Sequence, residues 1–265
     1  MARFLHLTDL HVVAPGKLAS GVLDTRSQLC AAVDRLMQLR EPLGPLDALL
    51  VTGDVSDDGS AESYAHARRE LERLELPLLV TPGNHDNREA MRAAFADLQV
   101  MPSSGLIDWF AEVGDTCIVG LDTLVEGQGG GRLRPQSLAL LGKGIAAAGN
   151  RPVIVALHHP PLRTGIRFMD AIGLENTVVL EPILAKARGN VMIVCGHVHG
   201  VYQGHIGSHA VMTAPSTCSA FALDLRTDAP IGFFKGPTGF AVIDTGSGGV
   251  WSALPLDAAD GPFPF

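Results

Sequence analysis

Five short apolar runs of this chain each end in a cluster of polar side chains, and this repeated junction constrains the fold more than any other feature. The runs cover residues 3–7, 48–52, 77–81, 152–157 and 191–195. They are short and rich in Val, Leu and Ile, which is typical of buried β-strands. The sequence therefore predicts at least five strands whose ends carry chemically active residues.

Helical patterns separate several of these runs. Apolar residues recur every three or four positions in three stretches: Leu29, Ala32, Val33, Leu36 and Met37; Tyr64, Ala67, Leu71 and Leu74; Leu138, Leu141 and Ile145. Pro42 lies just beyond the first stretch, Ser60 is a candidate N-cap of the second, and Pro135 precedes the third. Strands that alternate with helices predict an α/β protein.

The pattern changes after about Gly204. Residues 209–213, 240–245 and 250–254 have strand character, Gly and Pro turns separate them, and no strong helical pattern remains. We expect a single domain over residues 1–265, in which residues 204–265 add antiparallel strands. The long loops 162–177 and 215–238 are candidates for a cap over the site.

Composition excludes several classes of protein. The formal net charge is −8 and no run of Lys or Arg occurs, which argues against a nucleic-acid polymer as partner. No apolar stretch approaches the roughly 20 residues of a membrane span, and the first residues do not form a signal peptide. The four cysteines are widely spaced, as expected for reduced thiols of a cytoplasmic protein. A homo-oligomer remains open.

The polar clusters can converge, because ligands of α/β sheets bind beyond the carboxyl ends of the strands. Their side chains supply only oxygen and nitrogen donors, which suit Mn, Fe, Zn or Co. The pooled residues are Asp9, His11, Asp54, Asn84, His85, His158, His197 and His199. Four other histidines, His6, His66, His205 and His209, are expected to have structural roles.

Spacing adds detail to this set. Asp9 and His11 are two residues apart, as are His197 and His199, so each pair shares one face of an extended segment. Gly53 precedes Asp54 and lets the backbone turn sharply there. Two facing pairs of this kind make a chelating pocket.

The order of these motifs resembles that of the calcineurin-like metallophosphoesterases. The resemblance rests on Asp9-x-His11, Gly53-Asp54, Gly83-Asn84-His85-Asp86, His158-x-Pro160 and Gly196-His197-x-His199, and it covers roughly residues 3–215. The stretches LHHPPL, MDAIGLEN and TAPSTC are similar to the class III phosphodiesterases, the branch of bacterial cyclic-nucleotide phosphodiesterases and glycerophosphodiesterases.

The resemblance implies a four-layer α/β fold, with two central mixed β-sheets flanked by helices, and a site for two divalent metal ions. It implies that Asp9, His11, Asp54 and His199 hold one metal. Asp54, Asn84, His158 and His197 would hold the other, with Asp54 bridging. The His-x-Pro spacing favours His158 over His159 as the ligand. His85 would face the substrate, and Asp86 would orient His85.

The expected activity is hydrolysis of a small phosphodiester, a cyclic nucleotide or a glycerophosphodiester, by a hydroxide that bridges the metals. Two divalent metals, two carboxylates and this hydroxide sum to a charge of about +1, which matches a diester monoanion. His85 would protonate the leaving group or stabilise the phosphoryl oxygens. The protein phosphatases of this superfamily carry an arginine after the second motif, and this chain does not.

Two alternatives stay open. A phosphomonoesterase would use extra cationic contacts to its dianionic substrate, for which Arg88, Arg163 and Arg167 are candidates. A non-catalytic scaffold is less favoured, because such relatives typically lose ligands or the histidine of the third motif, and this chain keeps all of them.

Overall fold

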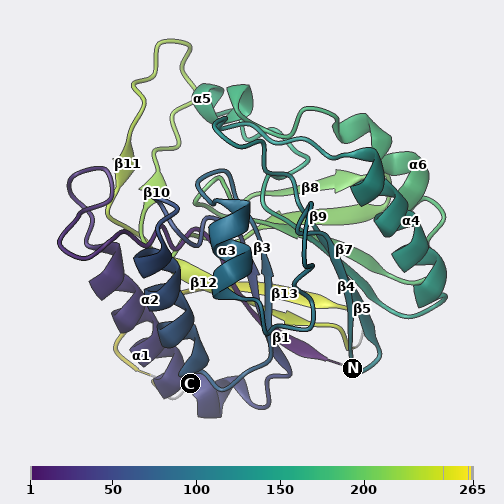
Figure 1. Ribbon diagram of the computed structural model, residues 1–265, viewed down its shortest axis with the longest axis horizontal. Coiled ribbons are helices and arrows are strands. Elements are labelled where there is room, and N and C mark those ends of the chain that lie inside the picture. Colours follow the sequence, from purple (N-terminus) through teal and green to yellow (C-terminus); the bar gives the residue numbers. More distant parts are fainter. Residues whose placement is uncertain (1, 247, 262, 264–265) are drawn as a thin grey trace.

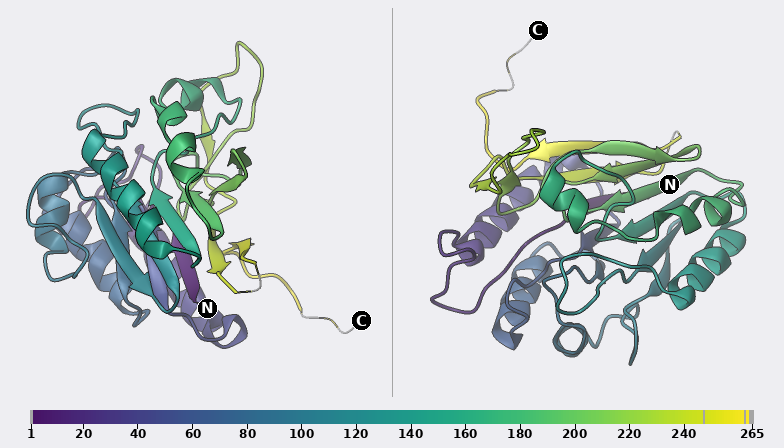
Figure 2. Two further views of the ribbon diagram at one scale, coloured as in Figure 1. Left: turned by 90° about the vertical axis from the view of Figure 1, so that its right-hand side faces the viewer. Right: turned by 90° about the horizontal axis from the view of Figure 1, so that it is seen from above.

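Two β-sheets lie face to face in the middle of the molecule, with helices on their outer sides (Figures 1 and 2). The structure is a computed structural model that describes residues 2–246, 248–261 and 263. In chain order the elements are β1 (Arg3–Leu7), α1 (Thr25–Leu43), β2 (Ala48–Thr52), α2 (Ala61–Glu72), β3 (Leu78–Thr81), α3 (Arg88–Ala94), β4 (Trp109–Val113), β5 (Thr116–Leu121), α4 (Pro135–Ala148), β6 (Val153–Leu157), α5 (Arg167–Ala171), the 3₁₀ turn η1 (Thr177–Val179), α6 (Glu181–Leu184), β7 (Val191–Cys195), β8 (Gln203–Ile206), β9 (His209–Thr213), β10 (Ala220–Phe221), β11 (Phe233–Phe234), β12 (Gly239–Asp244) and β13 (Val250–Pro255).

The first sheet has the strand order β13-β12-β1-β2-β3. Strands β1, β2 and β3 are parallel, whereas β12 and β13 add to it in antiparallel fashion. Helices α1 and α2 pack on it, and one apolar core runs from these helices through β1 and β2 to strands of the second sheet, with Leu29, Leu50 and Ile154 among its buried members. This core joins the two sheets.

The second sheet has the order β4-β5-β6-β7-β9-β8. Its central strands β5, β6, β7 and β9 are parallel, and the edge strands β4 and β8 are antiparallel. Helices α4 and α6 cover its outer face through a second core that contains Leu141, Leu184 and Val155. The expected α/β sandwich of two mixed sheets between helical layers is therefore confirmed (Figure 1).

The five apolar runs are confirmed as strands β1, β2, β3, β6 and β7. The three predicted helices are α1, α2 and α4, and the Ser60 side chain caps α2 by accepting the Ser63 N–H. The predicted end of α1 was too early, since the helix continues through Pro42 to Leu43. Met37 was also assigned to the buried stripe, but it is 41% exposed.

The C-terminal part corrects one expectation. β12 and β13 are antiparallel as predicted, but β9 runs parallel to β7, because β8 intervenes and reverses the chain. The two long loops contain α5 and the β10–β11 hairpin. The elements that the sequence pattern missed include the short helices α3, α5 and α6, the edge strands β4 and β8, and the two-residue strands β10 and β11. Helix α3 has only seven residues, and β8 is largely polar. Within the described residues, no helix combines the length and apolar character needed to cross a bilayer.

Candidate metal centre

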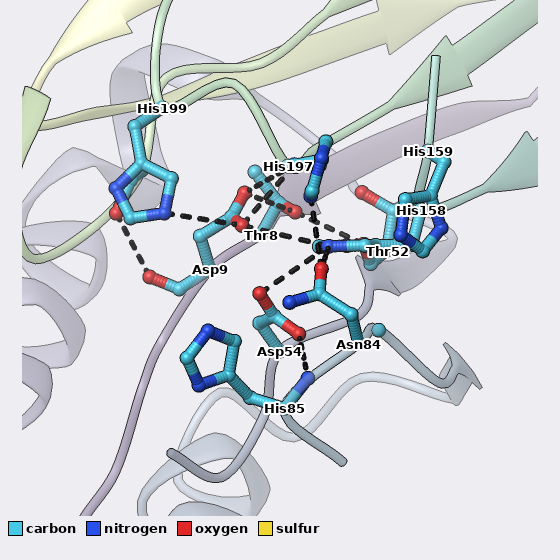
Figure 3. A network of polar contacts seen from close by, with 12 residues as sticks. Thr8, Asp9, Thr52, Asp54, Asn84, His85, His158, His159, His197 and His199 are labelled. Carbon is cyan, nitrogen blue, oxygen red and sulfur yellow. Dashed lines mark hydrogen bonds and ion pairs between the residues drawn. The ribbon is translucent and has the colours of Figure 1, made fainter. Parts of the chain in front are cut away.

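The polar side chains that follow β1, β2, β3, β6 and β7 meet in one cluster beyond the carboxyl ends of these strands (Figure 3). β1, β2 and β3 belong to the first sheet, and β6 and β7 belong to the second. The site therefore spans the two sheets, and neither sheet alone supplies all its groups. All eight pooled residues are brought together there.

One group of donors surrounds His11 and His199. Their Nε2 atoms are 3.0 Å apart. Asp9 Oδ1 lies 3.4 Å from His199 Nε2, and Asp54 Oδ2 lies 3.5 Å from His11 Nε2. These are the four residues that the resemblance implies for one metal.

A second group surrounds Asn84. Its Oδ1 lies 3.1 Å from His158 Nε2 and 2.9 Å from His197 Nδ1. Asp54 Oδ2 lies 3.3 Å from the same His158 nitrogen. These donors match the set implied for the other metal.

Asp54 stands between the two groups (Figure 3). Its Oδ2 approaches His11 on one side and His158 on the other, at 3.5 and 3.3 Å. Its Oδ1 accepts the backbone N–H of His85 at 2.9 Å. One carboxylate oxygen is thus held by the backbone while the other faces both groups of donors.

The donor spacing fits divalent metal ions. Two ligands at about 2.1 Å from one ion are about 3.0 Å apart at right angles and about 3.4 Å apart at a tetrahedral angle. The observed separations between His11, His199 and Asp9 and between Asn84, His158 and His197 lie near these values. Buried lone pairs that face one another at such distances repel unless a proton or a metal cation lies between them. The residues present therefore fit two cations.

The carboxylates of this cluster are held in their charged form. Burial raises the pKa of a carboxyl, but His199 and His158 outweigh this for Asp9 and lower its pKa to about 2. For Asp54, His158 and His11 outweigh burial in the same way and hold the pKa well below its usual range. Two buried negative charges side by side favour cation binding.

The backbone at the site is unusual. Of the seven non-glycine residues with positive φ in the described chain, five are candidate ligands: Asp9, His11, Asp54, His197 and His199. Such conformations are uncommon for residues with a Cβ and persist where the surrounding structure enforces them, often at functional sites. They turn the chain after β1, β2 and β7, where these ligands lie.

Two motif glycines allow this close approach. A Cβ at Gly83 would lie 2.2 Å from Asp54 Oδ1, and a Cβ at Gly196 would lie 1.9 Å from Thr8 Oγ1. Neither contact is tolerable, so a side chain at either position would displace a neighbouring loop of the site.

Each candidate histidine ligand has its second ring nitrogen fixed by another group. His11 Nδ1 is 2.9 Å from Asp57 Oδ1, and His158 Nδ1 is 2.8 Å from the Thr52 carbonyl oxygen. His197 Nε2 is 3.0 Å from the carbonyl oxygen of Ile172, and His199 Nδ1 is 2.9 Å from Ser219 Oγ. Such contacts orient metal-binding histidines and select their tautomers.

His85 is the exposed member of the cluster, with 42% of its side chain accessible. Its Nδ1 is 3.1 Å from Asp57 Oδ1, and its ring meets that of His11 edge-on at 4.7 Å. Burial alone would lower the pKa of His85, but the Asp57 hydrogen bond and the charges of Asp54 and Asp57 raise it to about 10. Asp57, which the sequence analysis did not select, therefore orients both His85 and His11.

The expectation that Asp86 orients His85 is corrected by this geometry. Both Asp86 oxygens are occupied by other donors: the backbone N–H groups of Val55, Ser56 and Gly83 and the hydroxyl of Tyr64. Burial and the charge of Asp54 outweigh these bonds and raise the pKa of Asp86 to about 6. Asp86 ties the loop after β3 to the loop after β2, while Asp57 takes the position beside His85.

His159 packs against His158 and His197, but its two ring nitrogens contact groups outside the donor sets. Its Nδ1 lies 2.8 Å from Thr123 Oγ1, and its Nε2 lies 3.1 Å from the Gly129 carbonyl oxygen. Both nitrogens are occupied, while His158 faces Asn84 and Asp54. This arrangement supports the choice of His158 over its neighbour.

The histidines expected to have structural roles lie elsewhere. His6 is buried against Thr52, and burial lowers its pKa to about 3. His66, Cys30 and Glu70 have ligand atoms within 4.8 Å of one another. However, the Arg69 side chain contacts His66 and the Arg73 side chain pairs with Glu70. Two arginines therefore already occupy the position that a metal ion would take beside this group.

A cavity of about 210 Å³ opens above the donors. His85, Asp57 and the candidate ligands line its polar side, and Leu23, Phe168, Met169, Phe221 and Phe233 line its apolar side. Among the residues that the structure describes, no Lys or Arg lines it.

The arginines considered as substrate contacts are engaged elsewhere. Arg88 forms a two-pronged ion pair with the buried Asp122. Arg163 lies 3.5 Å from Asp170, and Arg167 donates to the Thr227 carbonyl oxygen. The resulting cavity is apolar on one side, and its positive charge would come from cations bound by the donor cluster and from His85.

The family of the chain follows from comparison with known sequences. The calcineurin-like phosphoesterase family matches residues 2–201, which include every candidate ligand. This is a metallophosphoesterase fold with its motif residues in place. The chain belongs to the calcineurin-like phosphoesterase family, and membership implies that it binds divalent metal ions.

Two similar proteins belong to the phosphodiesterases by name. A 3',5'-cyclic adenosine monophosphate phosphodiesterase of Pseudomonas aeruginosa is 35% identical over 82% of this chain and 77% of its own length. A probable glycerophosphodiester phosphodiesterase of Arcobacter nitrofigilis is 30% identical over 88% of this chain and 85% of its own length. The resemblance stated from the motifs is thereby confirmed.

Solved structures agree on the fold. A dimetal phosphatase from Danio rerio superimposes with a TM-score of 0.68 at 12% identity, over 97% of this chain and 96% of the other. The purple acid phosphatase PPD1 of yellow lupin gives a TM-score of 0.66 at 13% identity, over 96% of this chain and 51% of the other. At such low identity these likenesses support the fold alone.

Proposed function

We propose that this hydrolytic phosphodiesterase acts on small phosphodiesters and uses two divalent cations. Asp9, His11, Asp54 and His199 would hold one cation, and Asp54, Asn84, His158 and His197 the other. The observation that carries the proposal is the single oxygen Asp54 Oδ2, which lies within 3.5 Å of donors from both groups. When bound, the two cations would supply Lewis acidity that lowers the pKa of water and offsets negative charge on the phosphate.

The chain's own residues perform the remaining tasks. Asp54 is aimed by the His85 backbone N–H, so the two loops after β2 and β3 keep a fixed relation. Asp57 accepts at His85 Nδ1, which leaves His85 Nε2 as the ring nitrogen available to a substrate in the cavity. A proton on this nitrogen would go to the oxygen of the departing alcohol, which is the task of a general acid.

The charge of the cavity favours a diester over a monoester. A diester carries one negative charge, which the metal site can balance, whereas a monoester dianion gains from additional cationic side chains. Since no Lys or Arg of the described chain lines the cavity, His85 is left to supply such a contact. A cavity of about 210 Å³ also lies below the roughly 300–1,000 Å³ of pockets for drug-sized ligands. This size suits a small substrate and not a nucleic-acid polymer.

One experiment tests the proposal against its alternatives. The purified protein would be analysed for bound metals and then assayed on bis(p-nitrophenyl) phosphate and p-nitrophenyl phosphate. We expect two metal ions per chain and a much higher kcat/KM on the diester. A preference for the monoester would favour a phosphomonoesterase. Bound metals without hydrolysis of either compound would favour a non-catalytic scaffold.

A further inference from the structure

We infer that the apolar wall of the cavity is a subsite for a flat, uncharged ring carried by one ester group of the substrate. The enzyme would then prefer diesters with a group of the nucleobase kind to diesters of glycerol. This inference rests on the proposed phosphodiesterase function of the same site, and it concerns the part of the substrate that does not react.

Three phenylalanines from two distant segments form this wall. Phe221 and Phe233 are directly paired across the β10–β11 hairpin, and both line the cavity. Phe168 comes from α5, and its ring meets that of Phe221 edge-to-face at 5.2 Å. In Figure 1 the hairpin and α5 stand beside each other at the top of the molecule. Aromatic rings thus gather on one side of a cavity whose other side is polar.

The wall is anchored by two small apolar clusters. Phe233 packs against Val13, Ala19 and Leu23 of the loop before α1. Phe168 and Phe221 pack around Ile166, Met169 and Val198. The hairpin joins these clusters, so the rings have fixed supports on both flanks.

The wall begins next to the metal-binding residues. The ring of Phe221 lies 4.4 Å from that of His199, with an angle of 36° between their planes. A diester whose phosphate meets the donor cluster would therefore bring its organic group against Phe221.

The chemistry of the wall selects among small diesters. Glycerol hydroxyls need hydrogen-bond partners, and burying them against phenyl rings without such partners costs free energy. A quaternary ammonium needs open aromatic faces. The Phe221 ring is already in contact with two other rings, that of His199 at a tilt of 36° and that of Phe168 edge-to-face, so it offers a cation no open cage of aromatic faces. A neutral flat ring can stack or pack edge-on against such a wall.

The test compares three diesters on the metal-loaded enzyme. Cyclic AMP carries a base, and methyl riboside 3',5'-cyclic phosphate has the same reacting diester without it. Glycerophosphocholine represents glycerol diesters with a cationic group. Stacking of a base on aromatic side chains is typically worth a roughly 10- to 100-fold effect, so we expect cyclic AMP to exceed both others in kcat/KM by about that factor.

Adjacent phenylalanines supply a matched control. Phe233 lines the cavity, whereas Phe234 on the same strand does not line it and is 61% exposed. Phe233→Ala should lose roughly tenfold on cyclic AMP, mainly through KM, and much less on the base-free compound, while Phe234→Ala keeps the wild-type preference. If the alanine variant fails to fold, Phe233→Leu takes its place in the test. It retains apolar packing against Leu23 and should show the same selective loss.

Two results would overturn the inference. One is equal kcat/KM on cyclic AMP and the base-free compound in the wild type, or a preference for glycerophosphocholine. The other is an equal loss on both cyclic substrates in the folded Phe233 variant. Failure of the proposed function itself would look different, because then none of the diesters would be hydrolysed although the metals are bound.

Discussion

The floor and the rim of the cavity are built in opposite ways. The floor consists of the donor residues at the ends of five strands, and most of it is buried: Asp9 and His158 are 0% exposed. The rim consists of α5 and the β10–β11 hairpin with its connecting loop. There, large apolar side chains reach into solvent, with Leu225 and Ile231 63% and 76% exposed.

This difference indicates that the floor carries out the reaction and that the rim selects the substrate. Every floor residue is fixed by a strand end, a left-handed backbone turn or a second hydrogen bond, so its position tolerates little change. The rim is held by short strands and small apolar clusters. Changes in the rim can therefore alter which diester binds while the floor keeps its reaction.

The two regions are nevertheless connected. His197 contacts the Ile172 carbonyl oxygen directly after α5, and His199 contacts Ser219 directly before β10. Two floor residues thus depend on the segments that carry the rim. The predictions below test how far this separation holds.

The largest effect is expected for Asp54→Ala. This change removes the one oxygen shared by both donor groups, so both metals should be lost and diester hydrolysis should fall by more than about 10³-fold, since removing even one preorganised group costs about 10²–10³. Elemental analysis and activity assays measure the effect, with the exposed Asp257→Ala as control. Retention of two tightly bound metals would show that the assignment of Asp54 is wrong.

The next largest effect on hydrolysis is expected for His85→Ala. General acid catalysis typically contributes about 10²–10⁴-fold, so hydrolysis of diesters with alkoxide leaving groups should fall by that factor. Bis(p-nitrophenyl) phosphate should suffer much less, because p-nitrophenolate leaves without a proton. The metal content should stay intact. Asp57→Asn should show a weaker form of the same leaving-group dependence through its contact with His85, and it should also weaken binding of the cation at His11, because Asp57 orients both rings. An equal loss on both kinds of substrate would assign His85 to charge stabilisation instead.

Asp86→Ala separates the structural part of the floor from its catalytic part. The change leaves three backbone N–H groups and the Tyr64 hydroxyl without their acceptor, and each unsatisfied buried donor costs about 1–3 kcal/mol. We expect the free energy of unfolding to fall by at least about 2 kcal/mol in urea titrations. A variant of unchanged stability that showed the leaving-group dependence of His85→Ala would restore the orienting role to Asp86.

The smallest effect is expected at the connection between rim and floor. Ser219→Ala removes the contact to His199 Nδ1. The affinity for the metal ion at His199 should fall by about 10- to 100-fold, the usual cost of losing a group that orients a ligand. Metal titration by calorimetry measures this, with Ser208→Ala in the exposed β8–β9 turn as control. Unchanged metal affinity would mean that the floor holds His199 without the rim.

Much of the fold followed from local pattern. The runs at β1, β2, β6 and β7 are apolar because both faces of a central parallel strand are buried, and this signal lies in consecutive residues. The run at β3 gives the same signal, because three of its four residues are buried although the strand lies at the edge of its sheet. The eight pooled donors were identified for the same reason, since each directly follows such a run. Edge strand β8 and short helix α3 lacked this signal, because polar or brief elements have no clear periodicity.

The chemistry of the floor can be predicted from the sequence alone: which oxygen and nitrogen donors are present, and that they follow strands whose ends share one edge. Which neighbours complete that chemistry depends on how distant segments pack together. Asp57 and Asp86 are both acidic residues of motif loops, and only three-dimensional packing directs the first to His85 and surrounds the second with four donors. Likewise Phe168 and Phe221 meet because α5 and the hairpin pack together, a contact between segments more than fifty residues apart that no local pattern encodes.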